Sequence, residues 1–224
     1  MVTGASRGIG AATARRLAED GYQVLGVARS SGGLAAMASG SAGITTLTAD
    51  VGDESSAEHI AAAANSMGRL EVWVNNAASL EKVPFASLDY HQWRETLRVD
   101  LDGVFLGCSA AFRQMASGDG GVIVNIASLS GVPAVEKFPG NTVYNVAKAG
   151  VIALTEAVAL EGKPHRIRCV CLSPGAVDTD MLRRAAPHLR PGVTPADVAA
   201  IIAFLVTPAA APLSGSNIPI FSNE

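Results

Sequence analysis

The stretch Gly4-Ala-Ser-Arg-Gly-Ile-Gly10 constrains the fold of this chain more than any other feature. It follows a short apolar segment, Met1–Thr3, and precedes apolar residues at helical spacing that end before Gly21. Strand, glycine turn and helix in succession suit a pyrophosphate, because glycines let the backbone approach phosphate and a helix N-terminus offers free N–H groups. Many glycine-rich stretches are merely turns, but this position predicts the start of a βαβ unit that binds a dinucleotide.

The rest of the chain alternates apolar strands with helices. Further strands are expected at 23–28, 45–51, 70–75, 121–126, 167–172 and 215–221. Helices are expected at 55–67, 89–115, from Thr142 onward, and at 195–205. A nearly continuous apolar strand such as 70–75 is typical of a parallel sheet buried on both faces. The sequence therefore predicts an α/β fold, a doubly wound (Rossmann) seven-stranded parallel sheet flanked by helices, as a single domain over 1–224.

The composition argues against some classes of binding partner. The chain is 49% hydrophobic and 17% charged, which is typical of a globular domain. Its net charge of −3, with no basic run, argues against nucleic acid or an anionic membrane. The apolar stretch 198–206 is too short to span a bilayer, and no signal peptide is expected at the N-terminus.

The cysteines are Cys108, Cys169 and Cys171. An odd number, with two alternating in an expected strand, favours reduced core thiols over disulfides or zinc ligands. We therefore expect no metal site and, by default, a cytoplasmic protein.

The end of the second expected strand bears on the choice of cofactor. An acidic residue there would bind the adenosine ribose and indicate NAD. This chain has Ala28, Arg29 and Ser30 instead, with a second guanidinium at Arg7. Two arginines and no carboxylate suit a 2′-phosphate, so NADP(H) is expected over NAD(H). The alternative is that both arginines are ordinary solvated surface residues.

Tyr144 and Lys148 are the candidate catalytic pair. They lie at i and i+4 of an expected helix, which places both side chains on one face. An ammonium beside a phenol favours the phenolate and lowers the pKa of the phenol. Ser128, sixteen positions before the tyrosine, would hold a substrate oxygen against the phenol. Alone, a Tyr-x-x-x-Lys pair is weak evidence, because an exposed pair on an ordinary helix has the same pattern.

These motifs together resemble the short-chain dehydrogenase/reductase family, of the 3-oxoacyl reductase or ketoreductase kind. The matching segments occur in family order over nearly the whole chain: TGASRGIG at 3–10, Asp50-Val51, NNAA at 75–78, Ser128, YNVAK at 144–148 and SPGAVDT at 173–179. The resemblance implies hydride transfer between a nicotinamide and a carbonyl or alcohol carbon. Tyr144 would be the general acid or base, Ser128 would bind the substrate oxygen, and Lys148 would hold the nicotinamide ribose and lower the tyrosine pKa.

The resemblance also implies a set of cofactor-binding residues. These are Gly4, Ser6, Arg7, Gly8, Ile9, Gly10, Arg29, Ser30, Asp50, Val51, Asn76, Ala77, Ala78, Tyr144, Lys148, Pro174, Gly175, Val177 and Thr179. Members of the family are often homotetramers that pair two long helices, so a homotetramer or homodimer is expected.

The chain departs from the family pattern at four places. Asp100 stands where an asparagine commonly holds a water beside the lysine; its charge would pair with Lys148 and resist lowering of the tyrosine pKa. Ala78 replaces a glycine, and the chain ends Phe221-Ser-Asn-Glu224 without a terminal Gly-Gly. The first strand also lacks several residues that relatives place before it.

The substrate is less constrained. Segment 180–195 leaves room for one small helix, which suggests an open site. Apolar residues would line it: Val132, Val135, Phe138, Met181 and Leu182. They would equally serve to pack a loop. The leading hypothesis is an NADP-dependent carbonyl reductase acting on a small molecule. The alternatives are an NADP(H)-binding sensor or scaffold without turnover, and an NAD-linked dehydrogenase of sugars or steroids.

Overall fold

The computed structural model describes residues 1–222 and builds them around one parallel sheet. The strand order is β3-β2-β1-β4-β5-β6-β7, and every pair of neighbouring strands is parallel. The strands are β1 Val2–Thr3, β2 Val24–Ala28, β3 Ile44–Thr48, β4 Val72–Asn75, β5 Gly121–Ile126, β6 Ile167–Pro174 and β7 Asn217–Ile220. The predicted seven-stranded, doubly wound sheet is confirmed.

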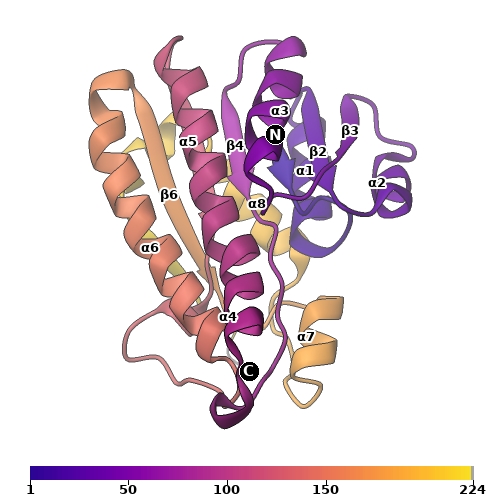
Figure 1. Ribbon diagram of the computed structural model, residues 1–224. Coiled ribbons are helices and arrows are strands. Elements are labelled where there is room, and N and C mark those ends of the chain that lie inside the picture. Colours follow the sequence, from indigo (N-terminus) through magenta and orange to yellow (C-terminus); the bar gives the residue numbers. More distant parts are fainter. Residues whose placement is uncertain (223–224) are drawn as a thin grey trace.

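Helices cover both faces of the sheet. On one face lie α3 (Glu54–Ser66), α5 (Gly103–Ala116) and α6 (Thr142–Gly162), side by side in front of the strands in Figure 1. On the other face lie α1 (Gly8–Glu19), α2 (Ser31–Ala38) and α8 (Pro195–Leu205). Two further helices, α4 (Tyr90–Leu97) and α7 (Asp180–Ala185), lie beyond the carboxyl ends of the strands. This three-layer arrangement leaves those strand ends free for a site.

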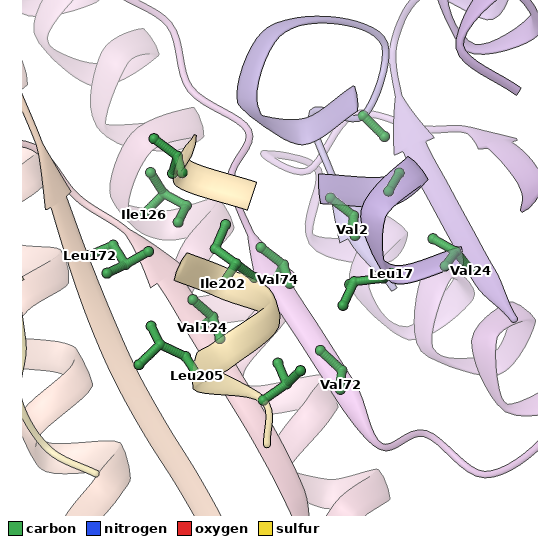
Figure 2. Packing of buried hydrophobic residues seen from close by; sticks show 14 of the residues in the cluster. Val2, Leu17, Val24, Val72, Val74, Val124, Ile126, Leu172, Ile202 and Leu205 are labelled. Carbon is green, nitrogen blue, oxygen red and sulfur yellow. The ribbon is translucent and has the colours of Figure 1, made fainter. Parts of the chain in front are cut away.

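Each face of the sheet buries its own apolar core. Figure 2 shows the core beneath α8, where Ile202 and Leu205 pack against valines of β4 and β5. Both side chains are buried, and burying one such side chain stabilises a fold by about 1.5–3 kcal/mol. The central strands are apolar on both sides because helices cover both, as the sequence of β4 predicted.

The structure also corrects several expected boundaries. Helix α2 was not expected, because Ser-Gly-Gly at its start is typical of a loop; the Ser30 side chain caps it by accepting from Gly33 N. Strand β3 ends at Thr48, before Asp50. The expected helix over 89–115 is interrupted by a π-helical turn, Arg98–Asp102. The α1 helix does end as predicted, with Gly21 in the left-handed region at φ +95°.

One helical segment, Thr142–His165, is long and apolar enough to cross a membrane by length and composition alone. It contains α6, which packs on β5 and β6 and buries Lys148, so in this fold it serves as a core helix. Its apolar window is nevertheless only 39% buried. The three cysteines are buried free thiols, as predicted. Asn223 and Glu224 of the atypical C-terminus lie outside the described residues.

Candidate active site

A cavity of about 950 Å³ runs along the carboxyl ends of the strands. It brings together nearly every residue predicted for the site. From the predicted catalytic and cofactor sets it is lined by Gly4, Ser6, Arg7, Gly8, Ile9, Arg29, Ser30, Asp50, Val51, Asn76, Ala77, Ala78, Ser128, Tyr144, Lys148, Pro174, Gly175, Val177 and Thr179. Two predicted residues, Gly10 and Asp100, are not part of its lining.

The turn between β1 and α1 is possible only with glycine at particular positions. Gly4 has φ +64°, and a Cβ there would lie 2.7 Å from Asn76 Nδ2. A Cβ on Gly10 would lie 2.3 Å from the Gly4 carbonyl oxygen, closer than real Cβ contacts. Glycine at position 10 therefore allows the close approach within the turn; Gly10 does not line the cavity, and its contact with the cofactor stays a prediction. Arg7 caps α1 without a side-chain hydrogen bond, so the first N–H groups of the helix stay available to an anion.

The two asparagines after β4 have different tasks. Asn76 Nδ2 donates to Thr3 O at 2.9 Å, and Asn76 N donates to Thr3 Oγ1 at 2.9 Å, which fixes this edge of the cavity to β1. Asn75, by contrast, bonds to other side chains and not to backbone. It is buried, accepts from Trp73 Nε1 at 2.7 Å and donates to Asn125 Oδ1 at 2.9 Å. Asn75 thus belongs to a polar ladder within the core.

The region beyond β2 carries positive charge. The side chains of Arg7 and Arg29 are exposed, line the cavity and enter no ion pair in the part of the chain that the structure describes. Asp50 also lines this region, but Arg98 Nη2 lies 3.2 Å from its Oδ2 and Gly52 N donates to its Oδ1 at 3.0 Å. Burial opposes ionisation of Asp50; these partners outweigh burial and lower its pKa. The Asp50 carboxylate is therefore already neutralised by a third arginine, Arg98.

Ser128 follows β5 and faces α6. Its Oγ accepts from Ser130 N at 3.1 Å, which leaves the hydroxyl proton free to be donated elsewhere. The short helical turn after it, Leu129–Gly131, packs directly on α6: a Cβ on Gly131 would lie 2.5 Å from the Lys148 carbonyl carbon. The missing side chain of Gly131 thus lets Ser128 reach Tyr144.

Tyr144 and Lys148 lie on one face of α6, as their spacing predicted. Lys148 is 1% exposed; its Nζ donates to Ile126 O at 3.2 Å and lies 5.5 Å from the centroid of the Tyr144 ring. The expected effect on the tyrosine is wrong in direction. Burial raises the pKa of Tyr144, Asp100 raises it further, and a hydrogen bond with Ser128 acts the other way. Proximity of Lys148 does not outweigh the removal of the phenol from water.

Asp100 lies in the π-helical turn, which packs against α6, and is completely buried. Its Oδ1 accepts from Ser79 N at 2.7 Å and from Ser79 Oγ at 3.3 Å. Among the described residues its Oδ2 has no hydrogen-bond partner, and no direct ion pair joins it to Lys148. The expected Asp100–Lys148 pairing is therefore a Coulombic interaction without contact. Its expected opposition to a lowered tyrosine pKa agrees with the structure.

The opposite end of the cavity is bounded by two surface segments. Of the five expected apolar residues, Val132 does not line the cavity. The other four do: Val135, Phe138, Met181 and Leu182. The expected small helix between Asp180 and Pro195 is α7. Several lining residues were not anticipated: Leu80, Lys82, Asn141, His188, Leu189, Arg190 and Ser222. No local motif marks them, although Asn141 directly precedes α6 at a position typical of a helix cap.

The residues at the β1–α1 end fit a dinucleotide. Backbone replaces side chains at Gly4 and Gly8, the N-terminus of the twelve-residue α1 has no acidic residue in its first turn, and two arginines lie beside it. A diphosphate needs such a backbone cradle and free N–H groups. Among the described residues, no cluster of three or more His, Cys, Asp or Glu side chains suits a metal ion.

Known proteins share both the sequence and the fold. A family model described as short chain dehydrogenase matches residues 1–190. The chain is 37% identical to a cis-4-hydroxycyclohexanecarboxylate dehydrogenase from Sinomonas cyclohexanicum, over 96% of this chain and 92% of that protein. It is 32% identical to a D-threitol dehydrogenase from Mycolicibacterium smegmatis, over 98% and 90% of the two chains.

A crystal structure of a short-chain type dehydrogenase/reductase from Mycobacterium marinum superposes with a TM-score of 0.90 at 28% identity, covering 99% of this chain and 92% of that one. With a matching family model, similar relatives along the whole chain and the same sheet, the chain belongs to the short-chain dehydrogenase family of oxidoreductases.

Proposed function

We propose that the protein is an NADP(H)-dependent oxidoreductase that interconverts a carbonyl group and a secondary alcohol. The observation that carries the proposal is the meeting of Ser128, Tyr144 and Lys148 on one cavity that also contains the glycine turn of α1. A hydroxyl, a phenol and an ammonium are the groups needed to hold a carbonyl oxygen and exchange a proton with it.

The β1–α1 end would hold the dinucleotide. The backbone at Gly4, Ser6 and Gly8 and the first turn of α1 would take the pyrophosphate. Lys148, whose Nζ has one protein acceptor among residues 1–222, would donate to ribose hydroxyls. When bound, the nicotinamide supplies or accepts the hydride.

The chain's own residues would handle the oxygen and the proton. Ser128, whose hydroxyl proton is not used in the bond with Ser130 N, would donate to the substrate oxygen and fix it beside Tyr144. Tyr144 would give its phenolic proton to that oxygen in reduction and take it back in oxidation. A phenol in its neutral form is the correct state for the first task, and burial of Tyr144 favours that form.

NADP(H) is proposed over NAD(H) because of charge. Arg29 follows β2, at the position where a carboxylate would otherwise bind ribose hydroxyls, and Arg7, the residue before α1, lines the same cavity. In the described part of the chain neither guanidinium enters an ion pair, so both could bind a 2′-phosphate, which a planar guanidinium suits well.

We propose a small ketone or secondary alcohol with an apolar body as the substrate, with 3-oxoacyl groups as one class to be tried. Four apolar side chains line the substrate end of the cavity: Val135, Phe138, Met181 and Leu182. The two dehydrogenases named above act on a polyol and on a hydroxylated ring acid, so membership of the family leaves the substrate open.

A homodimer or homotetramer is proposed from the apolar side chains that α5 and α6 leave exposed. Phe105 is 54% exposed, Val146 45% and Leu160 65%. Large exposed apolar side chains on neighbouring helices are typical of a covered surface. A cytoplasmic setting is inferred from the three free thiols.

The test is reduction of a panel of ketones, aldehydes and 3-oxoacyl thioesters by the purified protein, with NADPH and NADH in parallel. We expect turnover with NADPH that disappears in Tyr144→Phe. Turnover with NADH alone would contradict the role of the arginines and favour the NAD-linked dehydrogenase. Tight NADPH binding with no turnover would favour the sensor or scaffold.

A further inference from the structure

Asn141, the residue before α6, has a buried side chain whose amide is not used by the fold. Asn141 is 5% exposed and lines the cavity. Its Oδ1 is buried without a hydrogen-bond partner among residues 1–222, and the side chain does not cap α6. Because Oδ1 is the buried end of the amide, Nδ2, a hydrogen-bond donor, is the end left for the cavity. Buried polar groups nearly always have a partner, so this amide at a cavity wall indicates a ligand that accepts hydrogen bonds.

Lys82 reaches the same wall from the loop after β4. Its Nζ lies 5.8 Å from the centroid of the Phe138 ring, which attracts a cation and gives the ammonium a preferred position. Val83 N donates to Gly140 O at 3.0 Å and so ties this loop to the one that leads into α6. Lys82 lines the cavity and enters no ion pair in the part of the chain that the structure describes. Its ammonium is therefore available to an anion.

The other charges at this end of the cavity leave it positive. Arg190 also lines it and has no ion pair among residues 1–222. Asp180 lines it too, but Arg183 Nη2 lies 2.8 Å from its Oδ1. Glu136, at an exposed position, is a single carboxylate against Lys82 and Arg190. The N-terminus of the 21-residue α6, with no acidic residue in its first turn, adds partial positive charge.

We propose that Asn141 and Lys82 form a subsite for a carboxylate, so that the substrates are an oxo acid and the matching hydroxy acid. This inference rests on the proposed function and names its substrate class. Lys82 pairs with the carboxylate and Asn141 Nδ2 donates to it. Asn141 precedes Tyr144 by three residues, a rise of about 4.5 Å along a helix, so the carboxylate and the reacting carbonyl lie a few bonds apart.

The carboxylate takes no part in the bond changes. In reduction the carbonyl carbon gains a hydride from the reduced dinucleotide, the Tyr144 O–H bond breaks, and the carbonyl oxygen gains that proton. The subsite acts by holding the other end of the molecule, which fixes the distance of the carbonyl oxygen from Tyr144.

The experiment measures kcat/KM for reduction of 3-oxobutanoate, 4-oxopentanoate and 5-oxohexanoate, each beside its methyl ester. The ester nearly keeps the shape and removes the charge, so the acid-to-ester ratio measures the contribution of the subsite. We expect the wild type to prefer the acid by at least about tenfold for one or more of the three lengths, the effect of one charge-assisted hydrogen bond. A ratio near one at every length overturns the inference.

Substitutions of Lys82 test the charge. Lys82→Met removes the ammonium and keeps the apolar stem, and we expect the acid-to-ester ratio to fall about tenfold, mainly through KM for the acid. Lys82→Glu places a negative charge there and should make the ester the better substrate. Lys163→Met is the matched control, because Lys163 is exposed at the other end of α6 and does not line the cavity. A ratio that falls equally in Lys163→Met overturns the assignment to Lys82.

Asn141→Ala tests the amide. We expect the acid-to-ester ratio to fall about fivefold, while Asn141→Asp, which faces the substrate with a second carboxylate, lowers it further. An unchanged ratio in folded Asn141→Ala and Asn141→Asp overturns the role of Asn141. If neither variant folds, the substitutions of Lys82, at an exposed loop position, still decide the inference.

Failure of the inference and failure of the proposed function give different results. Equal reduction of acids and esters that disappears in Tyr144→Phe overturns the carboxylate subsite and keeps the proposed function. If nothing turns over, calorimetry of 4-oxopentanoate with the NADPH-saturated protein decides. Binding that weakens about tenfold in Lys82→Met supports the subsite while the oxidoreductase falls, and the absence of such a difference overturns both.

Discussion

The two ends of the cavity are built differently. At the β1–α1 end, backbone segments pack directly against one another. At the other end, beyond Tyr144, the walls are formed by two surface segments, 131–141 and 180–190. A methyl group added to Gly4 or Gly10 would overlap neighbouring atoms. Phe138 and Met181, by contrast, are only partly buried; Phe138 lies in a loop and Met181 in the short helix α7. The β1–α1 end is fixed by close packing, so it tolerates few substitutions. The second is built from side chains that are exchangeable without disturbing the sheet.

The largest effect is expected at the close-packed end. Gly10→Ala forces a Cβ against the Gly4 carbonyl oxygen and Asn76 Nδ2, and overpacking of this kind costs about 1–3 kcal/mol. Because the turn itself must move, we expect NADPH affinity to fall at least about tenfold and the melting temperature to drop. Titration of NADPH fluorescence and thermal unfolding measure both. Gly32→Ala, where no atom lies within 4 Å of the added Cβ, is the control and should lose neither.

Arg29→Ala removes charge at the same end without touching the turn. Loss of one charge-assisted contact to a 2′-phosphate, worth about 1.5–3 kcal/mol, raises the NADPH dissociation constant about ten- to hundredfold. NADH affinity should hardly change, because NADH has no such phosphate. Arg16→Ala, an exposed arginine paired with Asp20, is the control. If the binding of NADPH and of NADH weakened equally, Arg29 would act through general electrostatic attraction and not through contact with the 2′-phosphate.

The smallest effect is expected at the substrate end. Phe138 lines the cavity and lies under the Lys82 ammonium, whose Nζ is 5.8 Å from the ring centroid. Phe138→Ala should raise KM for an apolar ketone about fivefold, roughly the loss of 1 kcal/mol of contact, with kcat and NADPH affinity retained. Phe85→Ala is the control, since Phe85 is 74% exposed and does not line the cavity. A large fall in NADPH affinity in Phe138→Ala would remove the distinction between the two ends.

A similar contrast, between local rules and contacts of distant segments, explains which features could be predicted from the sequence. The glycine turn and the Tyr144–Lys148 pair follow from local rules: a positive φ, a close approach, and a helical spacing of four. Their neighbours in space were therefore predictable as soon as the parallel sheet was recognised.

The direction of the Tyr144 pKa was not predictable in this way. It depends on how deeply the phenol is buried and on the charge of Asp100, and only the effect of Asp100 was expected from the sequence. No local sequence motif marks the π-helical turn that carries Asp100. The partner of Asn75 was missed for a similar reason, because the Asn75–Asn125 contact depends on the register of β4 against β5. Contacts and charge interactions between distant segments become known only from the folded structure.

Tyr144→Phe tests the central claim most directly, because it separates binding from proton transfer in one protein. The substitution removes one hydroxyl from a side chain that α6 already holds in place. NADPH binding should stay within about twofold, while kcat for carbonyl reduction should fall by about 10²–10⁴, the range expected for loss of a general acid. Retained turnover with intact binding would contradict the assignment of Tyr144 as the proton donor.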